Sequence, residues 1–384
     1  MATRSEPGHP WYQLLDALLA RRVELVAEIT SRMRHRLSVY QELAPETFER
    51  HVAMAMECTV RLARVDPPGL SEWQTRVLEE VGDSQARLGV PVDQMLLAWR
   101  IGADVLLECG TEEAGRLGLD DQQLLAFVRR TLASSDVGMI STARAHRRAE
   151  LEQDREAQDR RASFVRAVLF GTGDLAELRA RAKAYGLDPG RPYLAIRARP
   201  AADGEWRGVE RAVGLAGSAR SGRGLSVLVD GDLAGFQLDP PGDAAPGRAG
   251  VGPAVPLDRL AESFRLATRA LNTMHAFGLA GTRDLAALGL RPAVANDADV
   301  GAALRRRYLE PLAESGSAAE IIATLRAYLA ASSHVETAAE QLHIHSNTLR
   351  YRLARFEELA GVSLRDPVVP FEVWWALQHA SIDT

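Results

Sequence analysis

The chain has few cysteines, and it has no long apolar run. The two cysteines, Cys58 and Cys109, are too few for a disulfide framework or for a zinc site made of cysteines alone. No apolar run approaches the roughly 18 residues of a membrane span. Residues 1–10 have no apolar segment of the signal-peptide kind. We therefore expect a soluble, reduced, cytoplasmic protein with no membrane contact.

The chain also lacks the excess positive charge of a nonspecific DNA binder. Its 46 basic and 51 acidic residues give a net charge of −5 over 384 residues. Only one basic residue, Lys183, is a lysine, and the other 45 are arginines. This balance excludes a histone-like polycation, but it leaves room for a sequence-specific DNA binder with one small basic surface.

The spacing of apolar and charged residues changes along the chain, and these changes predict a mainly α multidomain protein. Residues 11–140 have apolar residues at helical spacing, which predicts an all-α, sensor-like bundle. Residues 141–170 mix arginines with acids and predict one charged linker helix. Residues 171–312 contain short alternating strands, typical of a small α+β domain with an antiparallel sheet. Residues 318–382 form the last predicted module.

The clearest local signal is a pair of helices in this last module. Ser333 and Glu336 fit a capping box that starts a short helix. His343-Ile-His345 follows as a turn, Ser346 is expected to cap a second helix, and Gly361 to end it in the left-handed conformation. The two histidines have no carboxylate or cysteine partner nearby and are interpreted as turn residues, not as a metal site. A short helix, a tight turn and a longer helix predict a helix-turn-helix.

The second of these helices has the charge pattern of a DNA-recognition helix. No acid lies between Glu340 and Glu357, although residues 317–384 carry five arginines and eight acids in total. Arginine can pair with guanine, asparagine with adenine, and a helix start favours phosphate. The alternative is a merely solvated face on a helix-turn-helix that does not bind DNA. The side chains expected to contact double-stranded DNA are Ser346, Asn347, Thr348, Arg350, Tyr351, Arg352 and Arg355.

The stretch from Thr337 to Gly361, followed by Asp366-Pro367, resembles the C-terminal helix-turn-helix of PucR/CdaR-type bacterial transcriptional regulators. The core His-Ser-Asn-Thr-Leu-Arg-Tyr-Arg-Leu carries the likeness. Ser346 is a departure, because many relatives have arginine there, and one phosphate or base contact is therefore in doubt. The resemblance implies a transcription factor that binds DNA.

Two further resemblances cover most of the remaining chain. Gly250-Val-Gly252 and the run 260–271 resemble the degenerate GGDEF-like domain of such regulators. Arg87-Leu-Gly-Val-Pro91 and the segment 97–102 resemble the helical RsbRD-type domain. The RsbRD likeness leaves one alternative open, a signalling protein that works by docking partner proteins through its N-terminal helices.

An enzyme is not expected. A nucleotide cyclase needs carboxylates that hold metal ions against a triphosphate, and the Gly-Gly-Asp/Glu-Glu-Phe pentapeptide is absent from the sequence. Asp230 and Asp232 are interpreted as hairpin-turn formers. No cofactor and no metal ion are predicted.

The sequence also gives less detailed predictions about the effector site and the oligomeric state. Trp73, Arg87, Trp99 and Arg100 are candidates for a small-molecule effector pocket, since arginine beside an indole suits an anionic or aromatic ligand; core packing is the alternative. His51 is expected on the surface. One helix-turn-helix reads only a few base pairs, so we expect a homodimer or higher oligomer formed through the N-terminal and linker helices.

Overall fold

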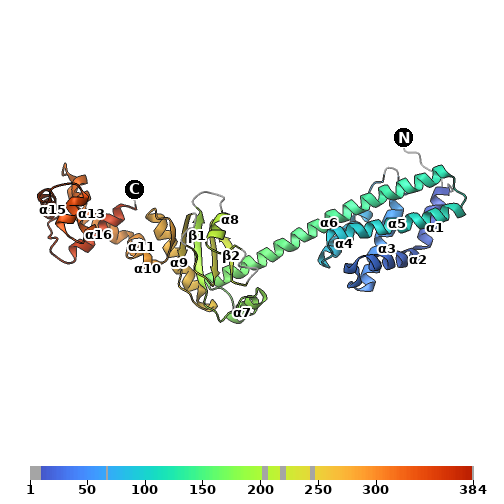
Figure 1. The fold of residues 1–384 in the computed structure, drawn as a ribbon, viewed down its shortest axis with the longest axis horizontal. Coiled ribbons are helices and arrows are strands. Elements are labelled where there is room, and N and C mark those ends of the chain that lie inside the picture. Colours follow the sequence, from blue (N-terminus) through green and yellow to red (C-terminus); the bar gives the residue numbers. More distant parts are fainter. Residues whose placement is uncertain (1–9, 66–67, 201–205, 217–221, 243–246, 383–384) are drawn as a thin grey trace. The chain divides into compact units, whose positions relative to one another are not determined.

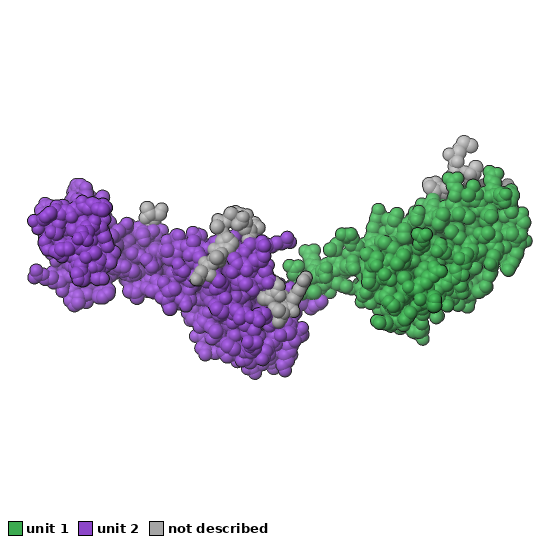
Figure 2. Space-filling view, in the orientation of Figure 1, with its two compact units in different colours: residues 1–159 green, residues 160–384 purple. Residues whose placement is uncertain are grey.

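The computed structural model describes residues 10–382 except 66–67, 201–205, 217–221 and 243–246. The segment 1–9, which showed no signal-peptide pattern, lies outside the described residues. The chain divides into two compact units, residues 1–159 and 160–384 (Figure 2). Helices dominate, and one small sheet lies in the middle of the sequence (Figure 1), which confirms the predicted fold class. Among the described helices, none is both long and apolar enough to cross a membrane.

The first unit is a helical bundle. Apolar residues at the predicted helical spacing, among them Leu14, Leu25 and Ile29, fill its core. Val23 is 84% exposed, because it comes two residues before the buried Leu25 and therefore lies on the opposite side of α2. The elements are α1 (Pro10–Ala20), α2 (Arg22–Arg36), the 3-10 helix η1 (Ser38–Gln41), α3 (Pro45–Leu62), α4 (Glu72–Arg87), α5 (Val92–Arg116) and the first part of α6 (Asp121–Phe170) (Figure 1).

Helix α6 is one continuous helix of 50 residues. It begins after Asp120, whose Oδ1 accepts a hydrogen bond from the Gln123 amide at 2.8 Å. It ends at Gly171, whose φ of +67° belongs to the left-handed region that stops helices. The last predicted bundle helix and the charged segment 141–170 are therefore a single element. Its residues up to Asp159 belong to the first unit and the rest to the second.

The second unit contains the sheet and the remaining helices. The chain's one lysine, Lys183, lies exposed on the first helix after α6. The elements are α7 (Leu175–Ala184), β1 (Leu194–Pro200), α8 (Trp206–Ala212), β2 (Gly224–Val229), β3 (Asp232–Gln237), β4 (Gly247–Val251), η2 (Leu257–Arg259), α9 (Leu260–Ala276), β5 (Gly281–Arg283), α10 (Leu285–Leu288), α11 (Arg291–Asn296), α12 (Ala298–Tyr308), η3 (Glu310–Leu312), α13 (Ala318–Ala330), α14 (Val335–Gln341), α15 (Ser346–Ala360) and α16 (Val369–Ala380).

The sheet has the strand order β2-β3-β1-β4-β5. Strands β1 to β4 pair antiparallel, as the sequence predicts. The short strand β5 runs parallel to β4, so the sheet is mixed and the expectation of a wholly antiparallel sheet was incomplete. Asp230 and Gly231 join β2 to β3 with φ values of +51° and +80°. Two left-handed residues in a two-residue loop are typical of a type I′ hairpin turn.

Two glycines allow helix α9 to lie directly on the sheet. A Cβ on Gly250 would come within 2.0 Å of the Ala267 carbonyl oxygen, and one on Gly252 within 2.1 Å of the Ser263 carbonyl oxygen. The hydroxyl of Ser263 links the layers, since it donates to the Pro253 carbonyl at 2.7 Å and accepts from the Ala195 amide at 3.1 Å. The Gly250-Val-Gly252 motif is therefore explained by backbone packing.

The C-terminal helices share one core. Leu325, Leu349 and Phe356, from α13 and α15, are fully buried in it. Tyr308 and Leu312, which precede the predicted start of this module at residue 318, are buried in the same core. Helix α12 and η3 thus contribute to the support of the helix-turn-helix.

Candidate nucleic-acid interface

The short helix α14 begins differently from its prediction. Its N-cap is His334, which makes no side-chain capping bond, so the capping box of Ser333 and Glu336 is absent. The reason is the end of α13, where Ser332 and Ser333 both adopt positive φ, 52° and 65°. An N-cap residue needs an extended backbone, and Ser333 cannot supply one from this conformation. Glu336 points instead to Arg350.

The turn between α14 and α15 is built around His343 and His345. His343 has a φ of +54°, and its amide and that of Ile344 bond back to the carbonyls of Glu340 and Ala339 at 3.1 and 3.0 Å. This pattern is a Schellman motif with histidine in the position usually held by glycine. His345, and not Ser346 as predicted, caps α15, because its Nδ1 accepts from the Asn347 amide at 3.1 Å. At the other end Gly361 has a φ of +64°, as predicted.

Helix α15 is held by one apolar face. Leu349, Leu353 and Phe356 are buried. At 100° per residue, Asn347 and Tyr351 project from the opposite side of the helix. Both are exposed, and Tyr351 is 71% exposed.

The three arginines of α15 do not form a single stripe. By the same helical projection Arg350 lies on one flank and Arg355 on the other, while Arg352 leans toward the core and is half-buried. Arg350 donates to Glu336 Oε1 at 2.7 Å and to Ser346 Oγ at 3.4 Å. Arg355 donates to Glu358 at 2.6 Å, whereas Arg352 has no ion-pair partner among the described residues.

Five of the seven predicted contact residues line the outer surface or the flanks of α15, and the other two, Ser346 and Arg352, lean toward the core. Ser346 is half-buried at the first turn, and Thr348 is exposed beside it. The surface is therefore polar, with guanidinium groups on both sides, and the chain has no carboxylate between Glu340 and Glu357. Two of its three arginines are neutralised by exposed carboxylates in the free protein.

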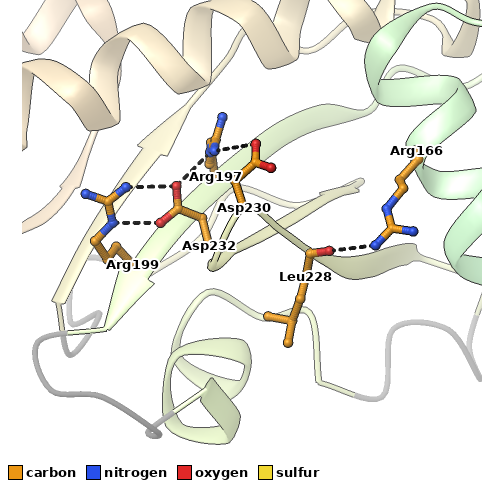
Figure 3. A network of polar contacts seen from close by, with 6 residues as sticks. All are labelled: Arg166, Arg197, Arg199, Leu228, Asp230 and Asp232. Carbon is orange, nitrogen blue, oxygen red and sulfur yellow. Dashed lines mark hydrogen bonds and ion pairs between the residues drawn. The ribbon is translucent and has the colours of Figure 1, made fainter.

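The hairpin of the middle domain holds a different arginine cluster. Asp232 is 1% exposed on β3 and accepts hydrogen bonds from Arg197 Nε at 2.8 Å and Arg199 Nε at 2.7 Å (Figure 3). Arg197 also lies 3.5 Å from Asp230, and Arg166 of α6 donates to the Leu228 carbonyl at 3.1 Å. The bonds to Asp232 raise the pKa of Arg199 above its ordinary value. Asp232 is thus more than the turn former that was expected.

The hairpin therefore offers no free pair of acids. Asp232 is occupied by two guanidinium groups, and only Asp230 faces water. Within the described parts of the chain, no group of three or more His, Cys, Asp or Glu side chains is placed to hold a metal ion.

The four candidate effector residues do not converge. Trp73 and Arg87 lie at opposite ends of α4, about 21 Å apart at 1.5 Å per residue. Trp73 is 46% exposed and lies under the guanidinium of Arg61. Arg87 and Arg100 are exposed. Only Trp99 is buried, and it lines a cavity inside the bundle.

His51 is the residue that sequence reasoning misplaced. It was expected on the surface, but it is 1% exposed and lines the same cavity as Trp99. The sequence contains the signal, because His51 follows Phe48 by three residues and precedes Val52, so it falls on the apolar face of α3.

Comparison with known domains accounts for most of the chain. Residues 321–379 match the PucR C-terminal helix-turn-helix domain. Residues 23–161 match the N-terminal domain of the RsbT co-antagonist protein rsbRD, and residues 170–273 match the GGDEF-like domain.

Whole-chain relatives share this length and order. Uncharacterized proteins from Mycobacterium bovis and Mycobacterium tuberculosis are each 30% identical over 414 residues, covering 97% of this chain and 95% of each relative. A solved structure, the regulator of polyketide synthase expression from Bifidobacterium adolescentis, is 18% identical and covers 57% of this chain and 96% of its own, with a TM-score of 0.28.

Proposed function

The chain belongs to the PucR-type transcription regulators, and on that premise we propose that it binds a specific double-stranded DNA sequence through helix α15. The observation that carries the proposal is the outer side of this helix. It presents Asn347 and Tyr351 to solvent, with Arg350 and Arg355 on its flanks, over a buried Leu-Leu-Phe face. A helix supported in this way fits the major groove.

The projection of α15 assigns different tasks to its side chains. Asn347 and Arg350 lie in the first turns, where recognition helices contact base edges, and they have the donors that read adenine and guanine. Thr348 and Arg355 lie on the other flank and are placed for the phosphate backbone. Ser346 is half-buried beside Arg350 and orients it, and Arg352 leans toward the core; both are expected to contribute less to direct contact.

In this proposal, Glu336 binds Arg350 when no DNA is present, and DNA takes its place in the complex. In the free protein its carboxylate binds the guanidinium that would face the groove. The side chains of Arg350 and Glu336 are 53% and 69% exposed. Exposed pairs of this kind contribute about 1 kcal/mol or less, so a base or phosphate can replace the carboxylate at small cost.

We further propose that the protein acts as a homodimer, with α6 as the contact between copies. Five large apolar residues of α6 are 45–63% exposed, and four of them have spacings of 7, 8 and 11 residues that keep them within one stripe of the helix. These four are Leu125, Leu132, Ile140 and Leu151. A twofold pair of chains would place two recognition helices on adjacent half-sites.

The middle domain has a regulatory and not a catalytic task in this proposal. Its hairpin acid is already bound by two guanidinium groups, as described above. A signal received by the helical unit and the middle domain would control the DNA affinity of α15.

The test is capture of genomic DNA by the purified full-length chain, followed by sequencing of the retained fragments. A recurring palindromic site is expected, and its affinity should fall linearly with salt on a log–log plot, because bound arginines displace counterions. If no fragment is enriched, or if affinity does not change with salt, then DNA is not the output. Partner docking by the N-terminal helices would then be the better explanation.

A further inference from the structure

The helical unit contains a cavity of about 50 Å³ between helices α2, α3, α4, α5 and α6. Most of its wall is apolar, from side chains such as Met33, Phe48, Met95 and Leu106. All of the lining residues belong to the first unit. The space exceeds the 10–15 Å³ or so that one water molecule needs, and it is smaller than a cavity of about 150 Å³ that accepts benzene.

His51 lies in the wall of this cavity with neither ring nitrogen hydrogen-bonded to any described residue. The side chain is 1% exposed, so bulk water does not satisfy it either. A buried polar group without a partner destabilises the folded state, and native proteins keep few of them. Its neighbours in the same wall are different, since Thr59 donates to the Ala55 carbonyl at 2.9 Å and Gln85 accepts from Tyr40 at 2.8 Å.

We propose that this cavity binds a small uncharged organic molecule that has an apolar body and one hydroxyl or carbonyl group, hydrogen-bonded to His51. The imidazole offers one donor and one acceptor in its neutral form, which suits either group. Methionine side chains in the wall are flexible and can adapt to the shape of the guest.

The lining argues against charged ligands. No aspartate, glutamate, arginine or lysine is among the described lining residues, and His51 is the one titratable side chain there. Burial lowers the pKa of His51, so the ring is neutral at pH 7. A carboxylate in this space would be buried without a countercharge, which is far more costly than burying a neutral carbonyl. The effector class proposed here therefore differs from the anionic or aromatic ligand expected from the sequence.

The inference that this molecule is the regulatory signal rests on the proposed function. The inference that the cavity binds such a molecule does not depend on that function. The binding test contains no DNA, so its outcome is independent of whether α15 binds an operator. The probes are acetone and 2-propanol, which have a carbonyl and a hydroxyl on similar apolar bodies. Acetate is the matched control, because it has nearly the shape of acetone and carries a charge.

The experiment is a titration of the full-length protein, labelled at its nine histidines, followed through the imidazole signals in NMR spectra. We expect saturable shifts of the His51 signal with acetone and 2-propanol, and none with acetate. His51→Leu identifies the signal. With binding followed instead through the methyl signals of the lining Met33, Met56 and Met95, this variant should bind about five- to tenfold more weakly, as loss of one hydrogen bond predicts. His35→Leu, at an exposed position on α2, is the matched control and should bind as the parent does.

A second variant keeps the histidine and removes the space. Ala103→Leu adds bulk to the wall and should abolish the shift while circular dichroism shows a folded bundle. If the His51 signal does not respond to either neutral probe, or if acetate shifts it equally, the proposal is wrong. It is also wrong if His51→Leu binds both probes with unchanged affinity.

Discussion

Two arginine–carboxylate clusters of the second unit differ in how far their charged side chains are exposed to solvent. At the hairpin, Asp232 is 1% exposed and is held by two guanidinium groups (Figure 3). On the helix-turn-helix, Arg350 and Glu336 pair one to one, and more than half of each side chain is exposed. Both pairs have short hydrogen bonds, 2.7–2.8 Å. Distance alone therefore does not separate them.

The difference teaches which arginines are available to a partner. Breaking the hairpin cluster would leave two guanidinium groups facing a site built for a carboxylate, which is costly. Breaking the Arg350–Glu336 pair exposes two groups that water already solvates, at a cost of about 1 kcal/mol or less. The first cluster is structural, and the second can exchange its partner for DNA.

The largest expected effect is on the hairpin. Asp232→Asn keeps the shape of the side chain and removes the charge between Arg197 and Arg199. We expect a loss of about 3 kcal/mol in the free energy of unfolding, measured with urea. Asp230→Asn is the matched control, since its side chain is 79% exposed and asparagine tolerates its left-handed backbone. Equal stability of both variants would refute the contrast drawn between the clusters.

The second effect concerns DNA and not stability. Arg350→Ala should weaken operator binding by about 1–3 kcal/mol and relax preference at one base pair, if Arg350 reads guanine. Fluorescence anisotropy with operator and single-base variants measures both. Arg326→Ala removes the same charge from an exposed position on α13 and should have little effect. If the two variants bind alike, Arg350 contributes only general charge.

A third effect extends the comparison to a buried group that has no partner. His51→Leu should raise the free energy of unfolding by about 1 kcal/mol at pH 7.5, because an apolar side chain replaces an unsatisfied one. Burial, aided by Arg50 and opposed by Glu80, lowers the pKa of His51.

The sign of the pH effect follows from this shift. Below about pH 6.5 the unfolded chain binds a proton at this histidine that the folded chain does not. The parent protein should therefore lose stability as pH falls below that value, and His51→Leu should lack this part of the loss. Denaturant curves at several pH values measure it, with His35→Leu as control. A gap between parent and variant that does not widen at low pH would contradict the lowered pKa.

The smallest effect is at the exchangeable pair. Glu336→Gln removes the carboxylate that competes for Arg350, and operator binding should tighten by about 0.5 kcal/mol, with stability nearly unchanged. Glu340→Gln changes the same charge at an exposed position of the same helix and serves as the control. Weaker binding by Glu336→Gln would show that Glu336 orients Arg350 for DNA and does not compete with it.

The spacing of apolar residues predicted the helices and strands well where the buried face and the local turn or capping residues indicate the same element. The helix-turn-helix, the charged helix and the β2–β3 hairpin follow from patterns among residues that are close in the sequence. Gly361 ends α15 with a left-handed residue, as expected. Strand β5 has three residues and pairs with β4 through a crossover, and so short a segment has no pattern of its own.

Local sequence patterns gave wrong predictions where the conformation or the contacts of a residue depend on a distant or preceding part of the chain. Ser333 has the sequence of an N-cap, but the left-handed end of α13 had already fixed its backbone. Asp232 looks like a turn former until β1 brings two arginines to it. His51 falls on the apolar face of α3, but its polar side chain is buried only because four other helices pack against that face.

The exposed Lys183 on α7 makes the chain unusual for chemical probing. Apart from the α-amino group, amine-reactive reagents can modify this one position, so labelling with a dye or a spin probe is site-selective without mutagenesis. A bifunctional amine reagent cannot form an internal bridge between lysines. Any lysine–lysine adduct found by mass spectrometry must therefore join two copies of the chain through their α7 helices.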